Sequence, residues 1–260
     1  MKHVEMHNEI KIFGIKIKFY KKSYFYKIRR FIFDLYFYIK RLGINYNKYK
    51  IIPIGTYCFS RCIVTFNKLK PTKSMGEKSY PFDLADFSNF DKIIDLINNH
   101  FENFFDDIEY DSVNCIWKSK LLNAIFPHDK DLSREDFILR YKRRIDNFYK
   151  DIISDRHVYL LLSTQQLITE EQIQRLKNLV EEYRNGKPYD IVIINQNHNR
   201  LCFNIDNVSI IEQSQNANKL EYLAEHDWAY QLSTRKTRDA QEIYNEITKE
   251  FINIIKSTKY

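Results

Sequence analysis

The sequence places one thiol, Cys58, where it can act as a nucleophile. Four mainly apolar residues at 51–54 are followed by Gly55 and, after two more residues, by Cys58 and a helical pattern over 59–69. This order predicts a strand, a tight turn and a helix, with the thiol near the first turn of the helix. Unsatisfied N–H groups and about half a positive charge collect there, so such a thiol has a lowered pKa and attacks carbonyls as a thiolate. The alternative is a buried, inert thiol, because free cysteines are among the most buried residue types.

A nucleophilic thiol needs a general base, and His128 is the best candidate among the seven histidines. It stands in a polar turn directly after an apolar run at 124–126. A histidine in a turn is also a common surface residue, which is the alternative role. Asp83 follows a proline–aromatic pair and is a candidate for a fixed carboxylate that orients the imidazole, with a turn or a cap as its alternative role. We expect folding to bring Cys58 and His128 into hydrogen-bond reach.

The elements that would position these residues are clearest in the second half of the chain. A helix pattern over 169–186 begins with a capping box, Thr169 with Gln172, and separates two apolar runs. Strand, helix and strand of this kind form a βαβ unit. The sequence therefore predicts an α/β fold with a parallel, Rossmann- or flavodoxin-like sheet flanked by helices. The runs typical of its buried strands are 157–163, 189–195 and 208–212.

Ligands of parallel sheets bind beyond the carboxyl ends of the strands, which draws attention to the polar run after the second of these strands. A second polar and aromatic loop, at 225–228, precedes the last helical pattern and is able to line a pocket. The candidates for substrate binding are Tyr57, Asn197, His198, Arg200, His226 and Asp227.

Three further helices and two short strands complete the expected elements. Ser88 with Asp91 is typical of a helix start, and Ser133 is a second N-cap candidate. The expected helices span 90–105, 133–151 and 240–256. Residues 113–117 and 124–126 are expected to be two short strands, or a strand and a turn.

The basic residues are concentrated near the start of the chain. The formal net charge is +7, yet residues 16–50 alone hold eleven Lys and Arg against one acid, Asp34. Residues 11–20 alternate apolar and basic residues around Gly14, like an exposed or edge strand, and 24–42 have the spacing of an amphipathic, aromatic-rich helix. These patterns predict two parts, a basic arm at 1–49 and a single α/β domain at 50–260.

Two interpretations of the basic segment 16–50 stay open. An amphipathic helix with flanking Lys and Arg is typical of attachment to an anionic membrane surface. A helix packed on the body of the protein with a solvated basic edge fits equally well. A nucleic-acid partner is not expected, because the basic residues are confined to one end and no known nucleic-acid module is present.

Several classes of protein are not supported. The chain has no P-loop and no G-x-G-x-x-G run, so nucleotide-dependent phosphoryl transfer and dinucleotide chemistry are not indicated. The four cysteines form no C-x-x-C pair, and Cys58 with Cys62 makes a poor zinc site, so we expect no metal or cofactor. No apolar run approaches the ~20 residues of a membrane span. Cysteine usage fits a reducing compartment, and we expect a cytoplasmic protein, free or peripheral on the inner face of the membrane.

Five short motifs carry a resemblance to a known family. In their order and spacing, the chain resembles a bacterial and viral family named for papain-like cysteine peptidases, over roughly 50–165 and more loosely to the end. This resemblance implies Cys58 as the nucleophile, His128 as the base, and Asp83 or Asp129 as the orienting acid. The motifs are I-G-T-Y-C-F-S (54–60), S-Y-P-F-D (79–83), F-P-H-D (126–129), Y-K-R-R-I-D-N-F (141–148) and V-Y-L-L-L-S (158–163).

The fold implied by that resemblance conflicts with the sequence pattern. Papain-like folds combine a helical half with an antiparallel barrel, whereas residues 157–212 predict parallel strands. We follow the pattern for the fold. A nucleophile on a strand-to-helix turn is also similar to the arrangement in flavodoxin-like hydrolases of the GDSL type, with Cys58 in place of their serine.

Three functions remain as hypotheses. The first is a cysteine-dependent hydrolase or acyl transferase acting on a small-molecule, peptide or glycan substrate. The second is a glycosyltransferase or other transferase, because residues 10–18 are similar to N-terminal segments of bacterial enzymes that build lipooligosaccharide and capsule. The third is a non-catalytic, membrane-peripheral interaction protein.

Overall fold

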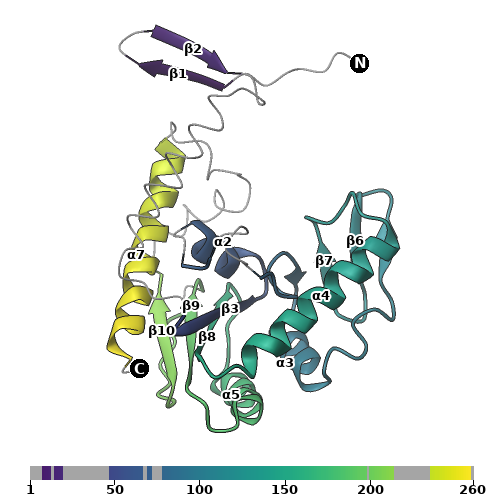
Figure 1. Cartoon of the computed structure of the whole chain (residues 1–260), viewed down its shortest axis with the longest axis vertical. Coiled ribbons are helices and arrows are strands. Elements are labelled where there is room, and N and C mark those ends of the chain that lie inside the picture. Colours follow the sequence, from purple (N-terminus) through teal and green to yellow (C-terminus); the bar gives the residue numbers. More distant parts are fainter. Residues whose placement is uncertain are drawn as a thin grey trace. The chain divides into compact units, whose positions relative to one another are not determined.

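We analysed a computed structural model of the 260-residue chain (Figure 1). It describes residues 8–12, 15–19, 47–66, 69–71, 78–197, 199–213 and 235–258. The chain divides into two compact units, residues 1–44 and 45–260. The candidate residues His198, His226 and Asp227 lie outside the described residues, as does the expected helix at 24–42.

The larger unit is built on a four-stranded parallel sheet. Its strands run in the order β10-β9-β8-β3, and each neighbouring pair is parallel. Helix α5 (Glu170–Arg184) connects β8 to β9. The predicted βαβ unit and the α/β class are therefore confirmed, and these strands do not form an antiparallel barrel. Their bounds are β3 Tyr49–Gly55, β8 His157–Thr164, β9 Tyr189–Asn195 and β10 Val208–Glu212.

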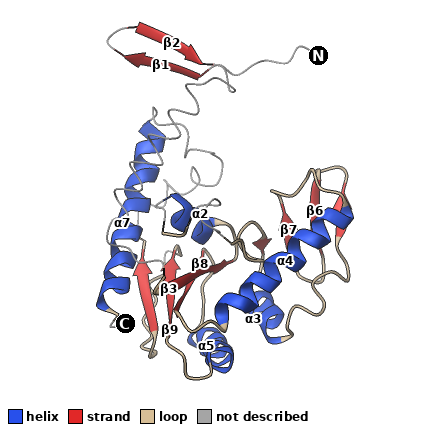
Figure 2. Cartoon of the chain, in the orientation of Figure 1, coloured by secondary structure: helices blue, strands red, loops and turns tan. Residues whose placement is uncertain are grey.

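The parallel strands are buried because helices cover both faces of the sheet. Alternate side chains of a strand point to opposite faces. Leu160 of β8 and Ile191 of β9 belong to a continuous core that also includes side chains of α3 (Phe90–Asn98), α4 (Arg134–Ile152) and α5. On the other face, the ring of Tyr159 meets that of Phe251 of α7 (Arg235–Ser257) at 5.8 Å. Figure 2 shows the strands between α7 and the helices α4 and α5.

A second sheet, which is antiparallel, follows α2 (Phe59–Phe66) in the sequence. Its order is β4-β7-β6-β5, with every neighbouring pair antiparallel. The ring of Phe126 in β7 packs at 5.1 Å against that of Tyr141 in α4, which fixes the sheet on the same core. The strands are β4 Asp86–Phe87, β5 Glu109–Asp111, β6 Ile116–Ser119 and β7 Ala124–Phe126.

Two of the expected elements have different bounds in the structure. The strand expected at 113–117 begins only at Ile116, because Asp111 accepts hydrogen bonds from the amides of the following turn and Cys115 has φ 53°. The helix expected at 90–105 ends at Asn98, because His100 and Phe101 have φ 52° and 59°, which a helix cannot contain. Its N-cap is Asn89 rather than Ser88.

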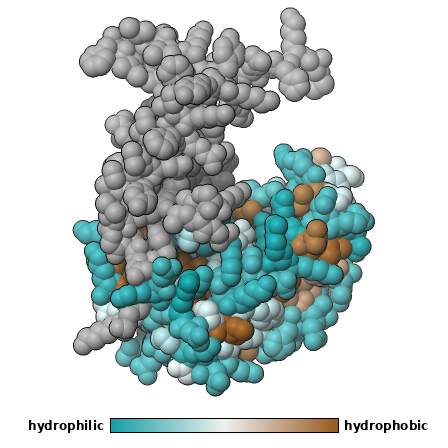
Figure 3. Space-filling model, viewed as in Figure 1, coloured by the Kyte–Doolittle hydropathy of each residue, from teal (hydrophilic) through white to brown (hydrophobic). Residues whose placement is uncertain are grey.

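Other helix starts follow the sequence closely. Ser133 caps α4 by accepting a hydrogen bond from the Asp136 amide, and Thr169 with Gln172 forms the expected capping box of α5. Helix α7 begins at Arg235, earlier than the expected 240. Among the described residues, no helix has the length and apolar character to cross a bilayer. The face drawn in Figure 3 is mainly hydrophilic, with small, separate apolar patches.

The described part of the smaller unit is a β-hairpin. Strands β1 (Asn8–Ile12) and β2 (Ile15–Phe19) are antiparallel, with Ile12 opposite Ile15. The expectation of one strand over 11–20 was therefore wrong, since the chain reverses between Ile12 and Ile15. Gly14, which the sequence pattern placed in the middle of one strand, lies outside the described residues.

Candidate active site

Cys58 lies in the turn between β3 and α2 (Phe59–Phe66), as the sequence predicts. The turn begins at Gly55, which lies against the end of β8 so closely that a Cβ there would be 2.6 Å from the Ser163 carbonyl oxygen. The Thr56 amide donates to that same oxygen at 3.3 Å. The end of β8 thus fixes the backbone that leads to the thiol.

The start of α2 is also tied to the sheet. The Ser60 hydroxyl donates to the Ile54 carbonyl at 2.8 Å, and the Ser60 amide donates to the Ser163 hydroxyl at 3.2 Å. Both serines are buried. The Cys62 amide donates to the Cys58 carbonyl at 2.9 Å, which is the first helical hydrogen bond after the turn. Cys62 therefore lies one helical turn beyond Cys58, on the same face.

The structure brings Cys58 and His128 together. His128 follows β7 in a turn that is closed by a hydrogen bond from the Asp129 amide to the Phe126 carbonyl, 3.3 Å. Each of the two side chains shifts the pKa of the other, so the imidazole lies near the Cys58 thiol. Cys58 is half-buried, whereas His128 is accessible to solvent.

The pKa values of this pair move in opposite directions. A hydrogen bond from Cys62 is the largest cause that lowers the pKa of Cys58, followed by the hydrogen bond and the positive charge of His128, and these outweigh burial to bring it to about 5. The hydrogen bond to Cys58 likewise raises the pKa of His128 against the effect of burial. The shifts therefore favour the thiolate form of Cys58 and the imidazolium form of His128 over the forms that burial alone would favour.

Among the carboxylates that raise the pKa of His128, Asp86 has the largest effect, and sequence reasoning missed it. Burial, followed by the negative charge of Cys58, raises the pKa of Asp86 to about 6, while His128 lowers it. Asp86 lies in β4 opposite Ile125 of β7, and the amide of its neighbour Phe87 donates to the Thr56 carbonyl at 2.6 Å. Nothing near Asp86 in the sequence signals this role, because it depends on the pairing of a two-residue strand.

The two expected orienting carboxylates hold other partners. Asp83 accepts a hydrogen bond from the Tyr80 amide at 3.0 Å and pairs with Arg61 of α2 at 3.5 Å. It closes its own turn, which is the alternative role considered above, and links that turn to α2. Asp129 accepts from the Tyr141 hydroxyl at 2.8 Å and pairs with two arginines of α4, Arg140 and Arg144. Its charge is the smallest of the causes that raise the pKa of His128.

The chain matches the model of a known protein family. The model of a family described as "Putative papain-like cysteine peptidase" matches residues 49–199. The chain belongs to this family. The match includes β3, Cys58, Asp86, His128 and β9. No match was found among curated proteins or among solved structures.

In this family member, side-chain amides surround the residue that precedes the nucleophile. The Tyr57 hydroxyl donates to Gln196 Oε1 and also hydrogen-bonds to Gln165, and burial raises its pKa. Gln196 Nε2 donates in turn to Gln213 Oε1 at 3.1 Å, and Asn197 Nδ2 donates to the Gln165 carbonyl at 2.8 Å. Of the predicted binding residues, Tyr57 and Asn197 thus lie in one network at the carboxyl ends of β8 and β9, and Arg200 is exposed beyond it. Gln165 and Gln196 were not among the predicted site residues, although Gln196 directly follows a predicted strand and Gln165 lies two residues after another.

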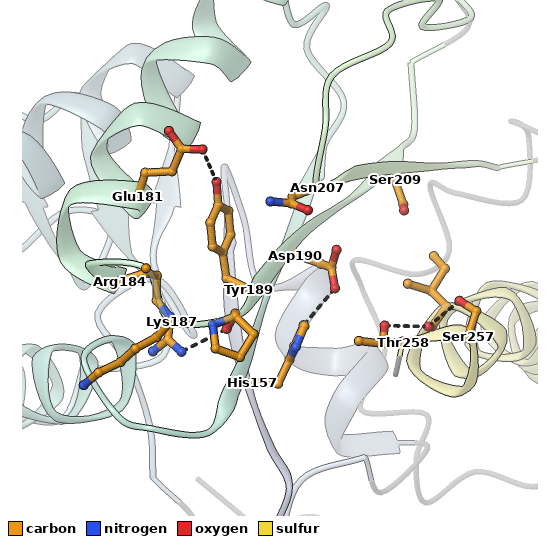
Figure 4. A pocket seen from close by; sticks show the side chains of 13 residues that line it. His157, Glu181, Arg184, Lys187, Tyr189, Asp190, Asn207, Ser209, Ser257 and Thr258 are labelled. Carbon is orange, nitrogen blue, oxygen red and sulfur yellow. Dashed lines mark hydrogen bonds and ion pairs between the residues drawn. The ribbon is translucent and has the colours of Figure 1, made fainter. Parts of the chain in front are cut away.

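The described residues contain no group of three or more His, Cys, Asp and Glu side chains that could hold a metal ion. A pocket of about 680 Å³ lies at the opposite, amino ends of the strands (Figure 4). Its polar groups bind one another, as His157 does with Asp190 at 2.8 Å and Tyr189 with Glu181 at 2.9 Å. His157 begins β8, whereas Ser163, near its other end, supports the nucleophile turn. The pocket is therefore separate from the thiol.

Proposed function

We propose that this protein is a cysteine-dependent hydrolase or acyl transferase, with Cys58 as nucleophile and His128 as general acid and base. The observation that supports the proposal is the position of Cys58 at the start of α2, near an accessible imidazole that lowers the pKa of the thiol. The family match supports the same class of chemistry.

In the proposed reaction, the Cys58 thiolate attacks a carbonyl carbon and the carbonyl oxygen gains negative charge. Backbone N–H groups at the start of α2 are the proposed donors to that oxyanion, and the positive end of the helix adds to their effect. The His128 imidazolium then gives its proton to the leaving group, and a thioester to Cys58 remains. His128, now neutral, takes a proton from water or from another acceptor that attacks the thioester.

Asp86 has a positioning role in this proposal. Its carboxylate lies in the field of both Cys58 and His128, and its negative charge stabilises the imidazolium. A pKa of about 6 makes Asp86 mainly ionised at neutral pH. The substrate is a carbonyl compound with a leaving group, for which peptides, esters, thioesters and acylated glycans are the classes to compare.

Mass spectrometry of the full chain tests the proposal. Incubation with a nitrophenyl ester, an acyl thioester and a peptide nitroanilide should give a covalent acyl adduct on Cys58 with at least one of them, and none in Cys58→Ser. Iodoacetamide at about pH 6 should label Cys58 at least tenfold faster than the exposed Cys115 and Cys202, since ordinary thiols have a pKa near 8.5. His128→Gln should reduce that preference, because it removes the imidazolium. Equal labelling of Cys58 and Cys202 would show that Cys58 is an ordinary thiol and would refute the proposal.

A further inference from the structure

A second thiol, Cys62, lies directly against the proposed nucleophile. Cys58 precedes the first residue of α2 and Cys62 lies in the first turn, where its amide donates to the Cys58 carbonyl at 2.9 Å. Each of the two side chains is also the largest influence on the pKa of the other. Both thiols are half-buried and reduced. Cys62 lowers the pKa of the nucleophile, and its sulfur is also placed to react with that of Cys58.

The two thiols are held in different protonation states. The pKa of Cys58 is lowered, whereas the hydrogen bond to Cys58 and burial raise the pKa of Cys62. Cys62 therefore stays protonated and donates to the thiolate. Arg61, whose charge opposes this rise, stands next to Cys62 in the chain and pairs with Asp83 at 3.5 Å. Cys58 is thus a charged nucleophile, and Cys62 is a neutral thiol one helical turn away.

The separation of the two residues fits a disulfide. Residues four apart in a helix have Cα atoms about 6 Å apart, and disulfides usually span about 4.4–6.8 Å between Cα atoms. Their Cβ atoms must approach more closely than the roughly 5–6 Å of a regular helix. Cys58 precedes the first residue of α2, so this approach requires a shift at Cys58 itself and not in the helical residues.

We propose that Cys58 and Cys62 form an oxidation-sensitive dithiol, in which a hydroperoxide oxidises Cys58 and Cys62 then closes a disulfide with it. This inference goes beyond the proposed carbonyl chemistry and does not depend on it. The other two cysteines differ, because Cys115 and Cys202 are exposed and neither has a thiol neighbour among the described residues.

The steps balance with the peroxide as the only oxidant. The Cys58 thiolate attacks one peroxide oxygen, the O–O bond breaks, hydroxide or alkoxide leaves, and Cys58 becomes a sulfenic acid. This removes the negative charge beside Cys62, so the Cys62 thiol can lose its proton. The Cys62 sulfur attacks the Cys58 sulfur, the S–S bond forms, the S–O bond breaks, and water leaves. Two thiols have lost two electrons and the peroxide has gained them.

The disulfide would consume the proposed nucleophile reversibly. It would prevent further oxidation of Cys58 to sulfinic acid, which thiols do not reverse. Reduction by a small dithiol would return both sulfurs to the state seen in the structure. A peroxide-treated sample should accordingly lose iodoacetamide labelling at Cys58 and regain it after reduction.

The sequence supplies a direct readout, because Arg61 lies between the two cysteines. The full chain is treated with about one equivalent of hydrogen peroxide, blocked with an alkylating agent, unfolded and digested with trypsin. Cleavage after Arg61 separates peptides 51–61 and 62–68. We expect these two peptides to remain linked through a disulfide and to separate after reduction. A variant with Cys115→Ser and Cys202→Ser should give the same linked peptides, and the protein should remain monomeric in a non-reducing gel.

A second variant tests the role of Cys62. In Cys62→Ser no disulfide can form, so dimedone should trap several-fold more sulfenic acid at Cys58 than in the unchanged chain. Equal trapping in the two proteins would overturn the proposal. So would oxidation of Cys58 to sulfinic acid without linked peptides, or peroxide oxidation of Cys202 as fast as that of Cys58. Any of these results would leave the test of acyl transfer by Cys58 unaffected.

Discussion

The pKa values of Cys58 and His128 depend on each other and on side chains from separate segments. Cys62 comes from α2, His128 from the turn after β7, and Asp86 from β4. Hydrogen bonds from the first two outweigh burial, which alone would favour the neutral thiol. The pH dependence of each charge follows from the direction of its pKa shift. The thiolate is lost as the pH falls below about 5, and the imidazolium is lost as the pH rises through the raised pKa of His128. The ion pair exists between these two limits.

Asp86→Asn tests the part of Asp86 in that ion pair. Loss of a negative charge near the imidazolium destabilises its charged form, so the pKa of His128 should fall, and a titration near pH 6 that belongs to Asp86 should disappear. The measurement is the pH dependence of the His128 ring resonances by NMR. Asp190→Asn is the matched control, because Asp190 pairs with His157 at the other end of the sheet. An unchanged His128 pKa in Asp86→Asn would remove Asp86 from the site.

The elements that carry the site differ in how well the sequence predicts them. Strands β3, β8 and β9 were predicted because a strand buried on both faces needs a continuous apolar run. The start of α2 was predicted from the order of an apolar run, a glycine and a cysteine. The capping box of α5 was predicted because the side chains of Thr169 and Gln172 each accept a hydrogen bond from the backbone N–H of the other. These are local signals, each contained within a few residues.

The rest of the site depends on contacts that no local pattern reveals. Asp86 approaches His128 only because β4 pairs with β7, and β4 has just two residues. The early end of α3 depends on positive φ angles at His100 and Phe101, neither of which is glycine or asparagine. Asp83 and Asp129 were chosen for their places in short motifs, and the structure gives both carboxylates to arginine partners. Tertiary pairing decides which of several nearby carboxylates faces the thiol.

The turn between β3 and α2 can be tested through Gly55. In Gly55→Ala the new Cβ would lie 2.6 Å from the Ser163 carbonyl oxygen and 2.9 Å from its hydroxyl, so the turn must shift. We expect a loss of about 1–3 kcal/mol in the free energy of unfolding, as for other overpacked sites. The rate of Cys58 alkylation at about pH 6 should also fall. Urea unfolding and alkylation rates measure the two effects.

Gly186→Ala provides the comparison. Gly186 follows α5 with φ 80°, but a Cβ there would meet nothing within 4 Å. Its replacement should cost about 1 kcal/mol through backbone strain and leave Cys58 alkylation unchanged. Equal alkylation in Gly55→Ala and the unchanged chain would mean that the contact with Ser163 does not position the thiol.

At the scale of the whole molecule, charge and chemistry are separated along the sequence. Residues 16–50 hold eleven Lys and Arg, and the rest of the chain is slightly acidic. The site residues Cys58, Asp86 and His128 all belong to the larger unit, residues 45–260. We propose that the basic segment attaches the protein to an anionic membrane surface. The proposed chemistry belongs to the larger unit. Lys and Arg each contribute about 1 kcal/mol at such a surface, and the attraction falls with salt.

Charge-neutralised full-length variants test that attachment. The change of Lys21, Lys22, Arg29 and Arg30 to Gln should reduce sedimentation with phosphatidylserine-containing vesicles by at least tenfold in partition coefficient, since about four charge contributions are lost. Binding by the unchanged chain should weaken between low and high salt, and neutral phosphatidylcholine vesicles should not retain it. The matched control changes four exposed basic residues of the larger unit to Gln. These residues are Lys120, Lys130, Lys142 and Arg143. If the control loses as much binding as the first variant, net charge alone governs the interaction, and the segment at 16–50 is then no specific anchor.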